Sequence, residues 1–172
     1  LYILQKGTGT AISAHESWTL AKNLKTLPVR FKQSVENAER LVKFLSQSNA
    51  IAEVYYPGNN PTHLRQASTG GAVIGFRLKD ESKAQTFVES LTLPLVSVSL
   101  GGVETILSHP ATMSHAAVPE AIRNKRGITF GLFRLSVGLE DPEEIIADIN
   151  YALKEAFNES ISEPIAEQRF GS

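Results

Sequence analysis

With 172 residues, 42% of them hydrophobic, the chain is long enough to bury the core of one domain. Its 17 basic and 18 acidic residues nearly cancel, so nucleic acid and anionic membrane surfaces are not expected partners. The absence of cysteine excludes disulfides, zinc–thiolate sites and a cysteine nucleophile, and it is compatible with the cytoplasmic location that we expect.

The N-terminal part of the sequence predicts a long helix interrupted near Pro28. Ser13 and Glu16 have the spacing of a capping box, in which each side chain accepts a hydrogen bond from the other residue's backbone amide. Because proline lacks an amide donor and crowds the preceding turn, we expect a kink at Pro28. The apolar residues before the proline are Trp18, Leu20, Leu24 and Leu27. Those after it, spaced by three and four, are Val35, Ala38, Leu41, Val42 and Leu45.

The rest of the sequence alternates between strand-like runs and amphipathic helical patterns. Asp141 is suited to cap the last helix, and Pro142 fits its first position. The predicted strands cover residues 51–56, 72–78, 95–99 and 133–137, and the predicted helices cover 80–91 and 142–157. Residues 108–131 are expected to be mostly loop, with a short helix near 119–125.

This order of elements predicts an α/β fold (an α+β sandwich), in which helices cover one face of a mainly antiparallel sheet. We expect residues 1–157 to form this domain together with the long N-terminal helix, and residues 158–172 to form a polar C-terminal tail. A fold class alone does not disclose a function.

Motifs for metal, phosphate or nucleophilic chemistry are missing from the sequence. His63, His109 and His115 lack the intervals of a helical metal site, and His15 lies in a capping turn, so we predict no metal. The glycine pairs lack the later glycine or the lysine of phosphate-binding loops. None of the serines has the strand before it and the helix after it that a nucleophile elbow requires.

Arg134 is the strongest candidate for a binding residue. It alternates with Phe133 and Leu135 in a predicted strand, which places the guanidinium on the face opposite to these apolar side chains. The planar guanidinium can bind a carboxylate through two parallel hydrogen bonds. A structural ion pair with one of the acidic residues is the alternative, and spacing alone does not decide between the two.

Several segments resemble the C-terminal signature of the pyridoxal-phosphate (PLP)-dependent Cys/Met metabolism, or trans-sulfuration, family. They are SLGGVET at residues 99–105, HPATMSH at 109–115, Gly127-Ile128, and RLSVGLED at 134–141. Lys25-Thr26-Leu27, Asn37-Ala38 and Tyr56-Pro57-Gly58 also occur in the family's order. The resemblance covers nearly the whole chain to about Phe157, and it implies the C-terminal small domain of a fold-type I PLP-dependent transferase.

The resemblance also implies roles for particular residues. Arg134 would bind the α-carboxylate of an amino-acid substrate, and Ser99 with the Leu100 backbone would line the site. The family's Schiff-base lysine lies upstream in a Ser-x-Thr-Lys context that none of the nine lysines here matches. The chain also opens at Leu1 without an initiator methionine, so we expect an inactive C-terminal fragment whose partner is the N-terminal PLP-binding domain, within a homo-oligomer that is a tetramer of paired dimers.

Val98 bears on which reaction the resemblance implies. It precedes Ser99, where cystathionine γ-synthases and γ-lyases often have glutamate, and an apolar residue there favours a β-lyase or a methionine γ-lyase. The segments from His109 to His115 and around Gly127 look most like bacterial cystathionine β-lyases, which form homocysteine, pyruvate and ammonia. The alternatives are a cystathionine γ-synthase or γ-lyase, a methionine γ-lyase, an acylhomoserine sulfhydrylase, or a non-catalytic α/β binding or assembly module.

Overall fold

A computed structural model describes residues 1–157; the predicted tail, 158–172, lies outside the described residues. Its central element is a five-stranded sheet with the order β1-β2-β5-β4-β3. All neighbouring strands are antiparallel except β3 and β4, which are parallel. The strands are β1 (Ile51–Tyr55), β2 (Val73–Leu78), β3 (Leu95–Val96), β4 (Ile106–Ser108) and β5 (Leu132–Ser136).

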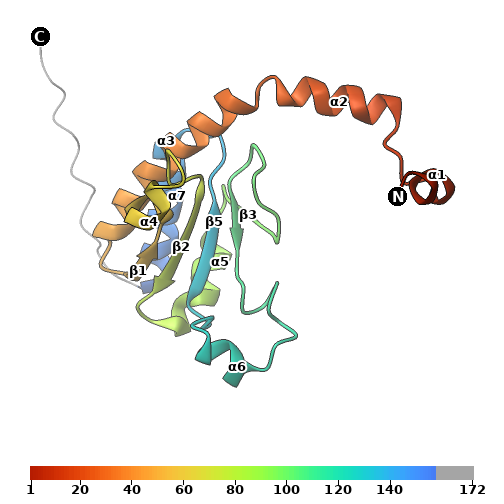
Figure 1. The fold of residues 1–172 in the computed structure, drawn as a ribbon. Coiled ribbons are helices and arrows are strands. Elements are labelled where there is room, and N and C mark those ends of the chain that lie inside the picture. The colour runs from red at the N-terminus through yellow and green to blue at the C-terminus, as the bar shows by residue number, and fades with distance from the viewer. Residues whose placement is uncertain (158–172) are drawn as a thin grey trace, which may run out of the picture.

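One face of this sheet is covered by α3 (Leu27–Gln47), α5 (Ala84–Ser90) and α7 (Pro142–Phe157), as Figure 1 shows. The core between the two layers contains three fully buried aromatic rings, those of Phe76, Phe87 and Phe133. The ring centroids of Phe87 and Phe133 lie 5.2 Å apart in an edge-to-face contact, a favourable aromatic geometry. The predicted apolar face of α3 is buried, and the predicted fold class is confirmed.

The N-terminal helices α1 (Tyr2–Thr8) and α2 (Ala14–Leu24) project away from the sheet (Figure 1). The predicted capping box is present, because Ser13 Oγ accepts from the Glu16 amide at 3.2 Å and Glu16 Oε2 accepts from the Ser13 amide at 3.0 Å. Pro28 lies in the first turn of α3, where the missing amide needs no partner, so it starts a new helix instead of kinking one. The predicted apolar residues of α2 are exposed.

Two strand predictions need correction. The predicted strand at 95–99 ends at Val96, because the next carbonyl groups accept hydrogen bonds from side chains of β4 and β5. The three-residue strand β4 was not predicted, since so short a run carries no periodic signal. The predicted helix near 119–125 is confirmed as α6 (Glu120–Lys125).

Short turns complete the chain. They are η1 (Pro57–Asn59), α4 (Pro61–Leu64) and η2 (Glu81–Lys83), the last of which precedes α5 directly. Among the helices of residues 1–157, none combines the length and apolar character needed to cross a membrane.

Candidate functional site

A row of four paired residues crosses the sheet on the face that the helices leave uncovered. Tyr55 of β1 pairs with Gly75 of β2, Gly75 pairs with Arg134 of β5, and Arg134 pairs with Ser108 of β4. Because side chains alternate between faces along a strand, this row lies opposite to the buried ring of Phe133. The strand alternation predicted for Arg134 is therefore confirmed.

A cavity of about 430 Å³ borders this row on the open face. Gly75 lines the cavity between Tyr55 and Arg134 without adding a side chain to it. A Cβ at residue 75 would lie only 3.3 Å from the Tyr55 Cβ. Arg134 and Arg77 both line the cavity, together with Gly127 and Ile128 of the predicted family motif. The cavity thus joins the centre of β5 to the loop that follows α6.

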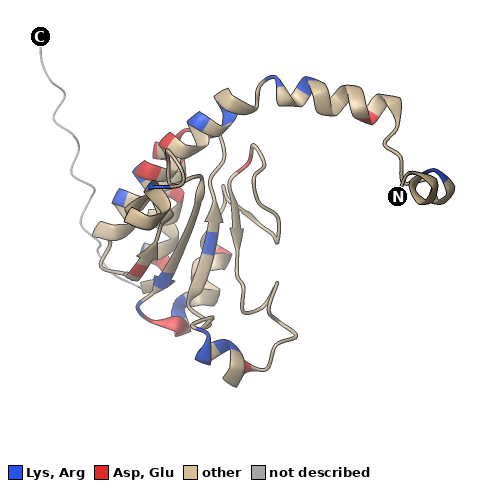
Figure 2. Cartoon of the chain, viewed as in Figure 1, with Lys and Arg blue, Asp and Glu red and all other residues tan. Residues whose placement is uncertain are grey.

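Arg134 is fixed through one nitrogen of its guanidinium group. Nη2 donates to the carbonyl of Val98 at 3.1 Å, to the carbonyl of Ser99 at 2.9 Å and to Ser108 Oγ at 2.9 Å. Nε is buried and has no hydrogen-bond partner in the part of the chain that the structure describes. Arg134 is the basic residue of β5, and Figure 2 shows its position as the blue segment of that strand. Within residues 1–157 Arg134 forms no ion pair, which disfavours the structural alternative.

The segment 97–104, here called the 97–104 loop, is held over the open face by side chains of β4 and β5. Ser108 Oγ donates to the Ser97 carbonyl at 2.5 Å, and Ser136 Oγ accepts from the Gly101 amide at 2.8 Å. Gly101 has φ of 75°, a left-handed conformation that glycine adopts without strain. The two segments singled out in the sequence, around Ser99 and Arg134, are therefore in contact.

The base of the 97–104 loop is tied to the residues that follow β5. Glu140 accepts from the Thr105 amide at 2.6 Å and from the Thr105 hydroxyl at 2.8 Å. The Gly138 amide donates to Thr105 Oγ1 at 3.0 Å. A Cβ at Gly138 would lie 2.3 Å from the Val103 carbonyl oxygen, so only glycine permits this approach. The structure thus explains why the RLSVGLED motif has glycine at residue 138 and glutamate at residue 140.

The predicted site residues differ in how they meet Arg134. Val98 and Ser99 contact it through their backbone carbonyls, while their side chains are exposed. Leu100 lies in the same loop with 54% of its surface exposed, and in the described part of the chain it makes no hydrogen bond to Arg134. Sequence reasoning missed Ser108, because a serine in a three-residue strand has no distinguishing pattern.

A second arginine of the cavity, Arg77, is paired within the sheet. Its Nη1 lies 3.7 Å from Glu53 Oε2, and its Nη2 donates to the Tyr55 hydroxyl at 2.6 Å. Burial raises the pKa of Tyr55 above its ordinary value, and the hydrogen bond that Tyr55 donates to Glu53 raises it further. Tyr55 therefore stays protonated, and Arg77 has an acidic partner in Glu53, whereas Arg134 has none within residues 1–157.

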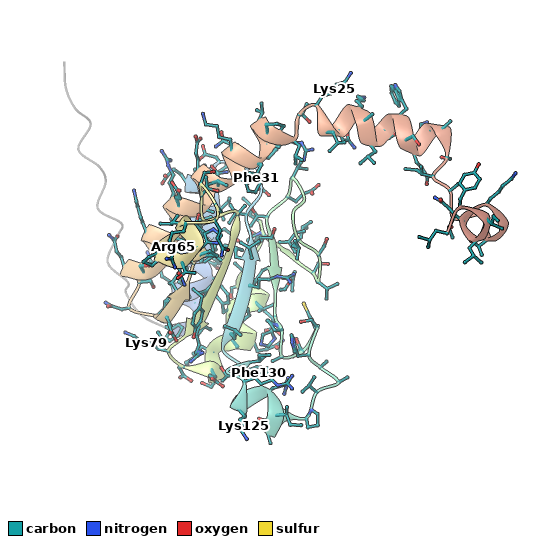
Figure 3. The ribbon with its side chains drawn as sticks, in the orientation of Figure 1. Lys25, Phe31, Arg65, Lys79, Lys125 and Phe130 are labelled. Atoms are coloured by element: carbon teal, nitrogen blue, oxygen red, sulfur yellow. The ribbon has the colours of Figure 1, made fainter. Side chains whose placement is uncertain are left out.

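The residues around the cavity suit a carboxylate better than covalent attachment of a cofactor. Its lining includes no lysine. Figure 3 shows Lys25 at the junction of α2 and α3, and Lys79 and Lys125 at the opposite end of the molecule, away from the middle of β5. Groups of three or more histidine or acidic residues that could hold a metal are absent from the described residues.

The protein is thus an α/β domain with a cavity on the open face of its sheet that is lined by the arginines Arg77, Arg126 and Arg134. The chain belongs to the Cys/Met metabolism PLP-dependent enzyme family, whose model matches residues 1–154. Over all 172 residues it is 79% identical to a cystathionine β-lyase of Staphylococcus haemolyticus, of which it covers 44%. It is 45% identical to a cystathionine β-lyase of Bacillus subtilis, with 90% of this chain and 41% of that protein covered.

A solved structure shares the fold. The cystathionine γ-lyase from Lactobacillus plantarum, complexed with L-serine, superposes with a TM-score of 0.82 and is 35% identical, with 90% of this chain and 42% of that chain covered. The chain thus spans less than half the length of the relatives it matches. The α/β fold is that of fold-type I PLP-dependent lyases and synthases, which confirms the predicted family and fold class.

Proposed function

We propose that residues 1–157 are the substrate-binding part of a PLP-dependent carbon–sulfur lyase that cleaves cystathionine, and that Arg134 binds the α-carboxylate of the substrate. The observation that carries the proposal is the Arg134 guanidinium, which is fixed on a rigid strand beside a cavity without an acidic partner in the described chain. A fixed guanidinium binds a carboxylate at a low cost in side-chain entropy. The names of the two β-lyase relatives support cystathionine as substrate.

The cofactor and the residues of this chain would have different roles in the reaction. PLP, when bound by the rest of the protein, supplies the electron sink for breaking the carbon–sulfur bond. Arg134 holds the substrate carboxylate, and the Ser99 and Leu100 backbone lines the same side of the site. The overall reaction converts cystathionine and water into homocysteine, pyruvate and ammonia. Since the cavity lining includes no lysine, we propose that the isolated chain is inactive.

The proposed partner of this chain is the PLP-binding part of the same protein. Its support is the apolar surface of α1 and α2: Ile3, Trp18, Leu20 and Leu24 are 84%, 61%, 53% and 54% exposed. We propose that the PLP-binding part covers these exposed apolar side chains in the whole protein. We further propose that the whole protein is a cytoplasmic homo-oligomer, as the family resemblance implies.

The test is product analysis with the full-length protein that carries this chain. It is incubated with L-cystathionine and PLP, and the keto acid is identified by mass spectrometry. The proposal expects pyruvate together with homocysteine. Formation of 2-oxobutyrate and cysteine would replace it by a γ-lyase, and the absence of any keto acid would overturn the lyase assignment.

A γ-lyase is the second candidate, because the L. plantarum structure that shares this fold is a cystathionine γ-lyase. Val98 would separate the two reactions. Its side chain is 63% exposed, in a loop whose carbonyl groups bind Arg134, so a charged residue there is accommodated without burial. The variant Val98→Glu in the full-length protein is expected to raise the share of 2-oxobutyrate; an unchanged product ratio would remove Val98 from the specificity determinants.

A further inference from the structure

We propose that Ser108 is a positioning residue for Arg134, which we call the carboxylate clamp. This inference rests on the function proposed for Arg134. Its hydroxyl oxygen lies 2.9 Å from Arg134 Nη2 and 2.5 Å from the Ser97 carbonyl oxygen. Among residues 1–157, this side chain is thus the one group that bonds both to the guanidinium and to the start of the 97–104 loop. Ser108 itself is only 4% exposed.

The two hydrogen bonds of Ser108 depend on each other. A hydroxyl has one proton and two lone pairs, and the Ser97 carbonyl can only accept. The proton therefore points to Ser97, and the lone pairs are left for the Nη2–H of Arg134. Because Ser108 is buried, water cannot easily take the place of this hydroxyl. The loop carbonyl thus orients the hydroxyl, which in turn orients the guanidinium.

Ser108 differs from the other two acceptors of Nη2 because it belongs to a strand and they belong to a loop. The carbonyls of Val98 and Ser99 belong to a loop, whereas Ser108 belongs to β4, which pairs directly with Arg134 across the ladder to β5. An acceptor on a neighbouring strand keeps the guanidinium in one rotamer before a ligand arrives. Removing it returns rotamer freedom to Arg134, and that freedom must be lost again on binding.

The expected consequence is a change in substrate affinity more than in turnover. Deleting the hydroxyl removes a hydrogen bond to a charged group, and part of the free energy of that bond is lost from substrate binding. In the full-length PLP-bound protein, Ser108→Ala should raise the KM for L-cystathionine about five- to tenfold. The value of kcat should stay within about twofold of the wild type, because PLP and the groups that move protons are untouched.

Ser90→Ala is the matched control. Ser90 lies on α5, on the helical side of the sheet, and its hydroxyl donates to the Thr86 carbonyl at 2.8 Å on the surface. Ser90→Ala therefore removes a serine hydroxyl and its hydrogen bond to a backbone carbonyl, as Ser108→Ala does, but on the other side of the sheet. Its KM and kcat should equal those of the wild type.

A double-mutant cycle separates positioning from a general structural effect. The ratio kcat/KM is measured for the wild type, Ser108→Ala, Arg134→Ala and the double variant. If Ser108 acts through Arg134, its deletion changes kcat/KM by less than about twofold in the Arg134→Ala background. Equal effects in both backgrounds, or an unchanged KM in Ser108→Ala, would overturn the inference. No keto acid from the wild type would instead overturn the proposed function.

Discussion

Glu140 and Thr105 are joined by two hydrogen bonds that close the base of the 97–104 loop. The carboxylate accepts from the Thr105 amide at 2.6 Å and from its hydroxyl at 2.8 Å. Thr105 is completely buried, so these bonds are shielded from water. Because Glu140 follows β5 and Thr105 precedes β4, the contact sets the position of the loop relative to Arg134.

The variant Glu140→Gln should therefore lower the stability of the full-length protein. A carboxamide offers one oxygen where the carboxylate offers two, so one Thr105 donor faces an NH₂ group. The expected loss is about 1–3 kcal/mol, measured as a shift of the urea unfolding midpoint. The exposed Glu155 of α7 provides the control, Glu155→Gln, which should leave the midpoint unchanged. Equal midpoints for both variants would show that the Thr105 contact contributes nothing.

Gly138→Ala should be more damaging than any other glycine-to-alanine change near the site. The new Cβ would lie 2.3 Å from the Val103 carbonyl oxygen and 2.5 Å from the Glu104 carbonyl carbon, both of them backbone atoms that cannot rotate away. The expected loss is about 2–4 kcal/mol, within the range of severe packing substitutions. Gly7→Ala is the control, because a Cβ there would have no atom within 4 Å apart from its chain neighbours and the nearby backbone of α1. Thermal unfolding of the two variants would decide, and similar midpoints would contradict the steric explanation.

The sequence predicts the fold wherever an element has its own periodic pattern. The face of α3 that includes Leu41 and Leu45, and the end of α7 near Asp141, follow from spacing and capping alone. The predictions fail at β3 and β4, where the strand pairing depends on side chains distant in sequence. Arg134 and Ser108 take the carbonyl groups that would otherwise extend β3. Patterns of neighbouring residues cannot predict that these distant side chains bind the carbonyl groups of residues 97–99.

The candidate site could be predicted only in part for the same reason. Alternation in β5 places Arg134 on the open face, but the row that it forms with Tyr55, Gly75 and Ser108 depends on strand register. Register becomes known only when the strands are paired in three dimensions. The residues that contact Arg134 therefore could not be predicted from spacing, whereas the placement of Arg134 on the open face could.

His109 should make stability depend on pH. It is 7% exposed, with Nε2 2.7 Å from the Phe130 carbonyl oxygen and its ring stacked on Phe133. Figure 3 shows Phe130 beside α6. Burial lowers the pKa of His109 below its usual value of about 6.5, the Phe130 hydrogen bond opposes this, and the Arg123 charge adds to it. The folded protein therefore holds His109 neutral at pH values where the unfolded chain takes up a proton.

The contribution of His109 is fully present above pH ~6.5 and is lost as the pH falls from there toward the lower pKa of the folded state. His109→Gln keeps an amide donor for Phe130 but cannot titrate. The denaturation midpoint of the wild type should fall more between pH 7.5 and 5.5 than that of the variant. Parallel curves would show that His109 is equally protonated in the folded and unfolded states.

The exposed apolar surface of α2 should cause the isolated chain to self-associate. Leu20 and Leu24 are each about half exposed, and burying the rest of each leucine would contribute about 0.8–1.5 kcal/mol. The double variant Leu20→Ser, Leu24→Ser should sediment as a smaller species than the unsubstituted chain. Lys22→Ser, in the same helix, should not change the sedimentation. A monomeric unsubstituted chain would argue against an interface on α2.

Arg134→Lys tests whether the geometry of the guanidinium matters or only its charge. Lysine keeps the positive charge, but it lacks the planar pair of N–H groups and cannot bind the Val98 and Ser99 carbonyls together with a carboxylate. In the full-length protein the KM for L-cystathionine should rise about tenfold to a hundredfold, corresponding to about 1.4–2.8 kcal/mol. Arg65→Lys provides the matched control, because Arg65 ends α4 and does not line the cavity. A KM within twofold of the wild type would mean that a point charge suffices, and the requirement for a guanidinium group would have to be abandoned.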